Sequence, residues 1–169
     1  MREFVLVFVC TGNICRSPMA EGIMKDLVLD EVERYHRVIP ILISSAGTLD
    51  MKGSPASRHA VEVAGKHGIN LMFHRSKPIN ESIARNADLI LTMEKNHTDF
   101  IKTYWPFCTN VFELKNFDRD VSNRPANSDV PDPIGMDMSV YADVFDELHA
   151  EITRIAQHVF SMAEKKSGN

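Results

Sequence analysis

The fold is decided by residues 4–18, Phe4-Val-Leu-Val-Phe-Val-Cys-Thr-Gly-Asn-Ile-Cys-Arg-Ser-Pro18. Residues 4–9 are continuously apolar and mostly β-branched or aromatic, which is typical of a strand buried on both faces at the centre of a parallel sheet. Ser17 is a favourable helix N-cap, and Pro18 suits the first helical position because its φ is already set. The stretch therefore predicts a strand, a loop over residues 10–16, and a helix that continues through Val28.

The rest of the chain alternates strands with helices. Further strands are expected over residues 38–44, 87–92 and 111–114, and Pro40 assigns the first of them to an edge because proline donates no ladder hydrogen bond. Helices are expected after Ser54-Pro55 with a stop near Gly68, after Asn80, over 94–104 and over 139–163. The alternation predicts one α/β domain over residues 1–169, a three-layer α/β/α (Rossmann-like) arrangement with a four-stranded parallel sheet and a ligand site beyond the carboxyl ends of the strands. Residues 115–135 are polar and irregular, which indicates a long loop that is either functional or disordered.

Composition excludes several classes of protein. The chain has 169 residues, 44% hydrophobic and 25% charged, so a disordered, collagenous or coiled-coil chain is disfavoured. Its 19 basic residues against 23 acidic ones give no general affinity for nucleic acid. No apolar run is long enough for a membrane span, and the one near the N-terminus is too short for a secretion signal. Three cysteines, an odd and small number, favour free thiols in a reducing compartment, so we expect a cytoplasmic protein.

The loop at Cys10 has the features of an anion site. Its amides and those of the first helical turn converge at a helix N-terminus, which favours a negative charge. Gly12 and Asn13 tolerate the positive φ that such a curled loop needs. Arg16 offers a planar fork of donors to two phosphate oxygens, and with the amides it is expected to stabilise Cys10 as a thiolate. We therefore expect phosphate or a similar oxyanion to bind residues of this loop, namely Thr11, Gly12, Asn13, Ile14, Cys15, Arg16 and Ser17.

The spacing disfavours other uses of this loop. A nucleotide-binding P-loop needs a lysine that is missing here, and Cys10 and Cys15 have no second ligand pair that would make a zinc site. No metal and no cofactor are therefore expected. The alternative for Cys10 is a buried core thiol at the end of a strand.

Beyond its local pattern, the chain resembles the low-molecular-weight protein tyrosine phosphatase family over essentially its whole length. The resemblance rests on Cys10-x5-Arg16-Ser17-Pro18, on Ser45-Ala-Gly-Thr48 and on Val130-Pro-Asp-Pro133. It implies that Cys10 is the nucleophile, that Arg16 binds phosphate and the transition state, and that Asp132 is the general acid of a phosphocysteine mechanism that needs no metal. It also implies four residues that hold the shape of the loop: Asn13, Ser17, Ser45 and His74. Cys15 either packs or, as the resemblance suggests, captures oxidised Cys10 in a reversible disulfide.

The sequence leaves the substrate preference open. Ile14 resembles the tyrosine-type relatives and offers an apolar wall to an aryl ring, whereas several segments resemble the family's arginine phosphatase branch. Met51 and Ile134 stand where the family tends to place aromatic pocket walls. We expect a phosphotyrosine phosphatase that acts on a phosphorylated protein or peptide. The alternatives are an arginine phosphatase, an arsenate reductase and a non-catalytic phosphate-binding or redox-sensing module, and the oligomeric state is left open.

Overall fold

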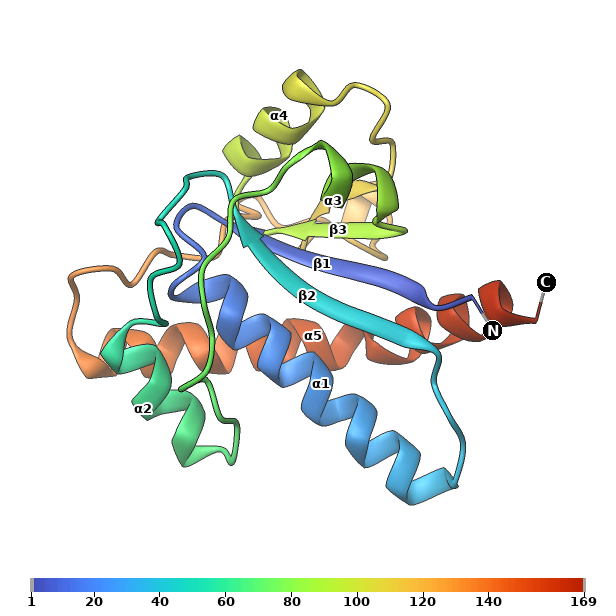
Figure 1. The fold of residues 1–169 in the computed structure, drawn as a ribbon, viewed down its shortest axis with the longest axis horizontal. Helices are drawn as coiled ribbons and strands as arrows, with labels where there is room; N and C mark the ends of the chain where they lie inside the picture. Colours follow the sequence, from blue (N-terminus) through green and yellow to red (C-terminus); the bar gives the residue numbers. More distant parts are fainter. Residues whose placement is uncertain (1, 169) are drawn as a thin grey trace.

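A four-stranded parallel sheet lies between two layers of helices in the computed structural model, which describes residues 2–168 (Figure 1). The strands are β1 (Phe4–Cys10), β2 (Ile41–Gly47), β3 (Leu89–Thr92) and β4 (Val111–Glu113), in the order β2-β1-β3-β4. One face carries α1 (Arg16–Tyr35), α2 (Arg58–Lys66) and α5 (Met138–Ser167), and the other carries α3 (Glu81–Asn86) and α4 (Lys95–Tyr104). This confirms the predicted fold class, with β1 central and β2 at an edge.

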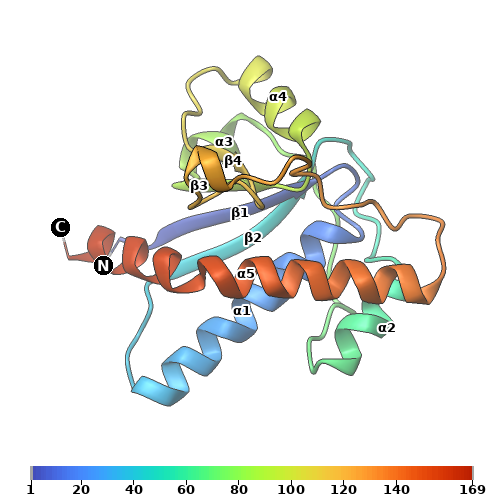
Figure 2. The same cartoon turned by 180° about the vertical axis from the view of Figure 1, so that it is seen from behind.

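Alternating side chains of β1 enter the two halves of the core. Phe4, Leu6 and Phe8 pack with α1, α2 and α5, while Val7 and Val9 belong to the cluster under α3 and α4. Both faces of the strand are therefore buried, which explains why its sequence is apolar without alternation. Helix α5 runs alongside α1 across one face of the sheet, as the view from behind shows (Figure 2).

The strand order creates a crevice at the carboxyl ends of β1 and β3. The chain leaves β1 through α1 on one face of the sheet and leaves β3 through α4 on the other. The loops that follow these two adjacent strands therefore diverge, and the space between them is the usual ligand site of such sheets. Cys10 lies at the end of β1, and Glu94 directly precedes α4 beyond the end of β3.

Several element boundaries differ from the sequence-based predictions. Helix α1 begins at Arg16, so Ser17 and Pro18 lie inside its first turn and Ser17 is not the cap. The reason is that the Ser17 hydroxyl contacts Cys10 and Asn13 instead of capping the helix. The second strand is Ile41–Gly47 instead of 38–44, because its ends follow the pairing with β1 from Phe4↔Ile41 to Cys10↔Gly47.

Two helices also begin away from their predicted starts. Helix α2 is capped by Ser57, whose Oγ accepts a hydrogen bond from the amide of Ala60, instead of starting after Ser54-Pro55. Helix α5 begins one residue early, where the Asp137 side chain caps it, and continues four residues beyond the predicted end. No helix among residues 2–168 has the length and apolar character needed to span a membrane.

The long loop between β4 and α5 is attached to α5 by charged side chains. Arg154 of α5 donates hydrogen bonds to the carbonyl oxygens of Leu114 and Phe117. The Oδ1 atom of Asp118 lies 3.0 Å from His158 Nδ1 of α5. The loop is therefore packed along one side of the molecule before it crosses the carboxyl ends of the strands.

Candidate active site

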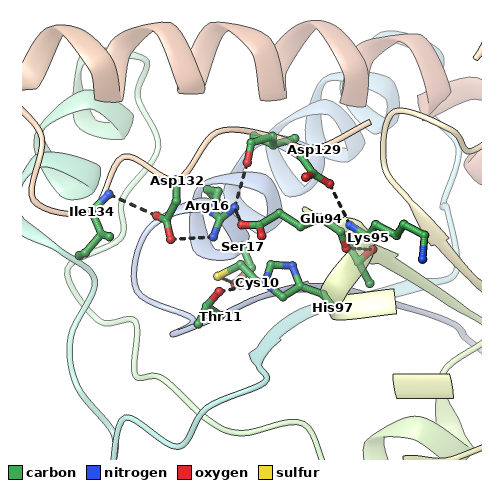
Figure 3. Close-up of polar contacts among 12 residues, drawn as sticks. Cys10, Thr11, Arg16, Ser17, Glu94, Lys95, His97, Asp129, Asp132 and Ile134 are labelled. Atoms are coloured by element: carbon green, nitrogen blue, oxygen red, sulfur yellow. Dashed lines mark hydrogen bonds and ion pairs between the residues drawn. The ribbon is translucent and has the colours of Figure 1, made fainter. Parts of the chain in front are cut away.

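A cavity of about 150 Å³ opens at the carboxyl end of β1, between the loop after β1, the segment after β2 and the loop that carries Asp132. It brings together segments that are far apart in the sequence, and Figure 3 shows the polar groups on one side of it. The lining residues are Cys10, Thr11, Gly12, Ile14, Cys15, Arg16, Leu49, Met51, Asp132 and Ile134. The three predicted catalytic residues and the three predicted pocket walls therefore meet in one cavity.

The loop after β1 is held from behind by Asn13, which does not line the cavity. Asn13 has a φ of 54°, a left-handed conformation that costs energy in a non-glycine residue. Its Nδ2 donates to the hydroxyls of Ser17 and Ser45, both at 2.9 Å, and its Oδ1 accepts from the Lys77 amide. His74 Nε2 lies 2.7 Å from the Asn13 carbonyl oxygen. The other three predicted support residues, Ser17, Ser45 and His74, thus each contact Asn13.

The Cys10 thiol lies at the bottom of the cavity and is 2% exposed. Its Sγ lies 3.0 Å from Ser17 Oγ and accepts a hydrogen bond from the Asn13 amide at 3.3 Å. The thiol thus lies where the loop amides and the start of α1 meet, and its role as the nucleophile stays a prediction.

Arg16 is the largest charged group in the interior, with 1% of its surface exposed. Its Nη1 donates to the Val130 carbonyl oxygen at 2.9 Å and to Glu94 Oε1, and its Nη2 donates to Asp132 Oδ2 at 2.8 Å (Figure 3). Within residues 2–168, Arg16 Nε is buried without a partner, so it is a donor that a bound oxyanion would satisfy. The guanidinium thus links the β1 loop, the start of α4 and the loop that carries Asp132.

Two polar residues of this site were missed by the sequence reasoning. Glu94 was expected only at the start of a helix, yet it forms an ion pair with Arg16. The signal that points to it is topological, because the chain that follows β3 lies beside the loop after β1. His97, which was not singled out from the sequence, is buried, and its Nε2 lies 2.8 Å from Thr11 Oγ1. Burial lowers the pKa of His97 to about 4, so its ring is neutral at physiological pH.

The second loop cysteine is turned toward α2 and α5. Cys15 Sγ donates to Ser57 Oγ at 3.3 Å and lies 3.2 Å from Tyr141 Oη. Burial raises the pKa of the Cys15 thiol and raises that of Tyr141 to about 12. Cys10, Cys15 and Cys108 are all free thiols, so a disulfide between the first two stays a prediction. Cys108 packs in the core under α3 and α4, on the other side of the sheet.

The cavity walls are aliphatic. Ile14, Met51 and Ile134 line it as predicted, and Leu49, which the sequence reasoning missed, completes the rim. Leu49 is placed there by its amide, which donates to the Thr11 carbonyl oxygen at 2.9 Å. Over residues 2–168, no group of three or more His, Cys, Asp or Glu side chains is arranged to hold a metal ion.

Comparison with known proteins is consistent with this geometry. The profile of the family "Low molecular weight phosphotyrosine protein phosphatase" matches residues 5–166. The protein-arginine-phosphatase of Geobacillus stearothermophilus is 36% identical over 153 residues, which is 90% of this chain and 93% of the relative. The low molecular weight protein-tyrosine-phosphatase Wzb of Escherichia coli (strain K12) is 31% identical over 152 residues, 90% of this chain and 92% of the relative.

A solved structure agrees as well. The YwlE arginine phosphatase from Geobacillus stearothermophilus superposes with a TM-score of 0.80 at 31% identity, over 96% of each chain. The chain therefore belongs to the low molecular weight phosphotyrosine protein phosphatase family. These relatives include a protein-arginine-phosphatase and a protein-tyrosine-phosphatase, so membership of the family does not determine the substrate.

Proposed function

We propose that this protein is a protein-tyrosine phosphatase that hydrolyses aryl phosphate monoesters through a phosphocysteine on Cys10. The observation that carries the proposal is the meeting of Cys10, Arg16 and Asp132 in one cavity, with Asp132 Oδ2 2.8 Å from Arg16 Nη2. A nucleophile, an oxyanion binder and a proton donor are the groups that such a reaction requires.

The first half-reaction transfers the phosphoryl group to the enzyme. The Cys10 thiolate attacks phosphorus in line, so that a sulfur–phosphorus bond forms while the bond from phosphorus to the aryl oxygen breaks. Asp132, protonated at this stage, gives its proton to the departing oxygen and is left as a carboxylate.

The second half-reaction releases phosphate. Water attacks the phosphocysteine, the Asp132 carboxylate takes up a proton from it, and the sulfur–phosphorus bond breaks to return the Cys10 thiolate and inorganic phosphate. In both steps, the loop amides and Arg16 stabilise the charge on the equatorial phosphate oxygens. These groups supply the positive charge for the transition state, so we propose that the reaction proceeds without a metal ion.

Asp132 is suited to donate to a leaving group at the mouth of the cavity. Its side chain is 36% exposed, while its Oδ1 accepts a hydrogen bond from the Ile134 amide at 3.2 Å. Pro131 and Pro133 restrict the backbone on either side of it. The carboxyl group is thus held at the edge of the cavity opposite the buried thiol.

Phosphotyrosine suits the walls better than phosphoarginine does. Ile14, Leu49, Met51 and Ile134 present apolar surface that an aryl ring would bury favourably. A guanidinium group would need acceptors, and Asp132 is the one carboxylate that lines the cavity among residues 2–168. Phosphoarginine is the second candidate, because the protein-arginine-phosphatase of Geobacillus stearothermophilus is 36% identical to this chain.

The proposal is tested by measuring phosphate release from matched phosphotyrosine and phosphoarginine peptides. EDTA is present in the assay to remove metal ions. We expect turnover of the phosphotyrosine peptide, and we expect Ile14→Thr to shift the ratio of kcat/KM values toward phosphoarginine. Equal ratios for wild type and Ile14→Thr would refute the role of Ile14. Hydrolysis of neither substrate would refute the enzyme and leave a phosphate-binding or redox-sensing module. The free thiols also suit a reducing, cytoplasmic location, which cell fractionation would test.

A further inference from the structure

The first turn of α4 has an unusual cap. Glu94 occupies the N-cap position with an extended backbone, but its side chain accepts no hydrogen bond from the helix. It pairs with Arg16 instead. The amide of Lys95, the first residue of the helix, donates at 2.9 Å to Asp129 Oδ1 (Figure 3). The carboxylate at this helix N-terminus therefore comes from the loop that carries Asp132.

The next residue of that loop is fixed to the same place. Val130 is fully buried, its amide donates to the Met93 carbonyl oxygen at 2.7 Å, and its carbonyl oxygen accepts from Arg16 Nη1 at 2.9 Å. On the other side, Lys115 Nζ donates to the Asp129 carbonyl oxygen at 2.8 Å. Asp129 and Val130 thus tie the loop to the start of α4 immediately before the general acid.

Little freedom remains between this attachment and Asp132. Asp132 follows Asp129 by three residues, and Pro131 and Pro133 fix two of the φ angles around it. A shift at Asp129 is therefore transmitted to the carboxyl group of Asp132 instead of being absorbed by the backbone. We propose that Asp129 is a positioning residue: by accepting a hydrogen bond from the Lys95 amide, it holds Asp132 where it can protonate the leaving group. The inference rests on the proposed function, in which Asp132 is the acid.

Leaving-group dependence distinguishes this role from a merely structural one. Phenyl phosphate needs a proton on its leaving oxygen, whereas 2,4-dinitrophenyl phosphate departs readily without one. General acids contribute roughly 10²–10⁴-fold to such steps, and a misplaced acid keeps part of that. We therefore expect Asp129→Ala to lower kcat/KM for phenyl phosphate about tenfold and kcat/KM for the dinitrophenyl ester less than about twofold. The comparison uses kcat/KM because this constant reports the first half-reaction, whereas kcat also contains hydrolysis of the phosphocysteine, which is common to both esters. Competitive inhibition by inorganic phosphate is expected to stay unchanged, because Arg16 and the β1 loop are untouched.

The chain offers matched controls. Asp129→Asn keeps an oxygen acceptor for the Lys95 amide and should restore most of the kcat/KM for phenyl phosphate. Asp120→Ala removes the same charge from an exposed position of the same loop and should behave as wild type.

The donor can be removed as well as the acceptor. Lys95→Pro deletes the amide hydrogen at the first helical position, where proline is tolerated, and Glu94 already has the extended backbone that a residue before proline adopts. Lys95→Ala is its control, since the Lys95 side chain pairs only with Asp99 among the described residues. If the hydrogen bond is the cause, Asp129→Ala, Lys95→Pro and the double variant share one loss of kcat/KM on phenyl phosphate.

The experiment is steady-state kinetics of these variants on both esters, with thermal melting as a check of folding. Uniform losses of kcat/KM on the two esters, additive losses in the double variant, or wild-type kcat/KM for Asp129→Ala on phenyl phosphate would each overturn the positioning role. Hydrolysis of neither ester by the wild-type protein would instead overturn the proposed function itself, so the two failures are distinguishable.

Discussion

Replacing Gly47 with alanine tests whether the shape of the β1 loop limits activity. Gly47 ends β2 and pairs with Cys10, and a Cβ placed on it would lie 2.7 Å from the Thr11 carbonyl oxygen and 3.1 Å from the Asn13 amide nitrogen. Ordinary contact begins at 3.4 Å, so the Thr11 oxygen must move by about 0.7 Å (3.4 minus 2.7). Because the atoms in the way are backbone, the loop itself has to shift.

The expected loss follows from that displacement. A misplacement of about 1 Å at a reacting centre costs about 100-fold, so we expect kcat/KM to fall roughly 10- to 100-fold in Gly47→Ala. Overpacking should also lower the free energy of unfolding by about 1–3 kcal/mol. Gly65→Ala is the control, because Gly65 lies inside α2 and no atom is within 4 Å of its added Cβ. It should gain about 0.5–1 kcal/mol of stability and keep full activity.

The assays are hydrolysis of an aryl phosphate and urea unfolding of the two variants and wild type. Activity is measured well below the urea midpoint of each variant, so that loss of folded protein does not count as loss of rate. A folded Gly47→Ala protein with wild-type kcat/KM would refute the reasoning, since the loop would then tolerate a shift of the size that the backbone contacts demand.

Three further outcomes are expected. The pKa of His97 is about 4 in the folded protein and about 6.5 in the unfolded chain, so its neutral ring contributes up to about 3 kcal/mol to the free energy of unfolding. This contribution is complete above pH 6.5 and is lost as the pH falls to about 4. Urea unfolding across this range should show a free energy of unfolding that falls with pH in wild type, and His97→Gln should remove that dependence. Glu94→Ala leaves the buried Arg16 short of a partner and should lower the free energy of unfolding by about 3 kcal/mol, with part recovered in saturating phosphate. Cys15→Ala, oxidised with peroxide, should regain less activity on reduction than wild type if Cys15 captures oxidised Cys10; equal recovery would leave Cys15 a packing residue.

Much of the fold could be predicted because its decisive signals are local. The apolar run of β1, the loop with Gly12 and Asn13, and the helix after it are each readable within a few residues. Element ends could not be read in this way. Gly47 belongs to β2 because it pairs with Cys10, and Ser17 does not cap α1 because its hydroxyl contacts the Cys10 thiol. Both outcomes depend on partners that only the folded chain brings close.

The same distinction applies to the site. Cys10 and Arg16 share one short loop, and Asp132 is singled out by the resemblance of Val130-Pro-Asp-Pro133 to the acid loop of the family, so all three could be predicted from the sequence. Glu94 and His97 could not, because their contacts with Arg16 and Thr11 cross the switch point of the sheet. Motifs in the sequence thus point to the proposed reacting groups, whereas the groups that contact them from β3 and α4 depend on strand order.

The central claim is that phosphate passes through Cys10, and trapping the intermediate tests it most directly. Wild-type protein mixed with an aryl phosphate is quenched in acid within one turnover, digested and analysed by mass spectrometry, with Cys10→Ala as the control. The account predicts a phosphoryl group on the peptide that contains Cys10, formed and lost at rates consistent with kcat, and absent from Cys10→Ala. Turnover without a phosphorylated Cys10, or continued turnover by Cys10→Ala, would contradict it.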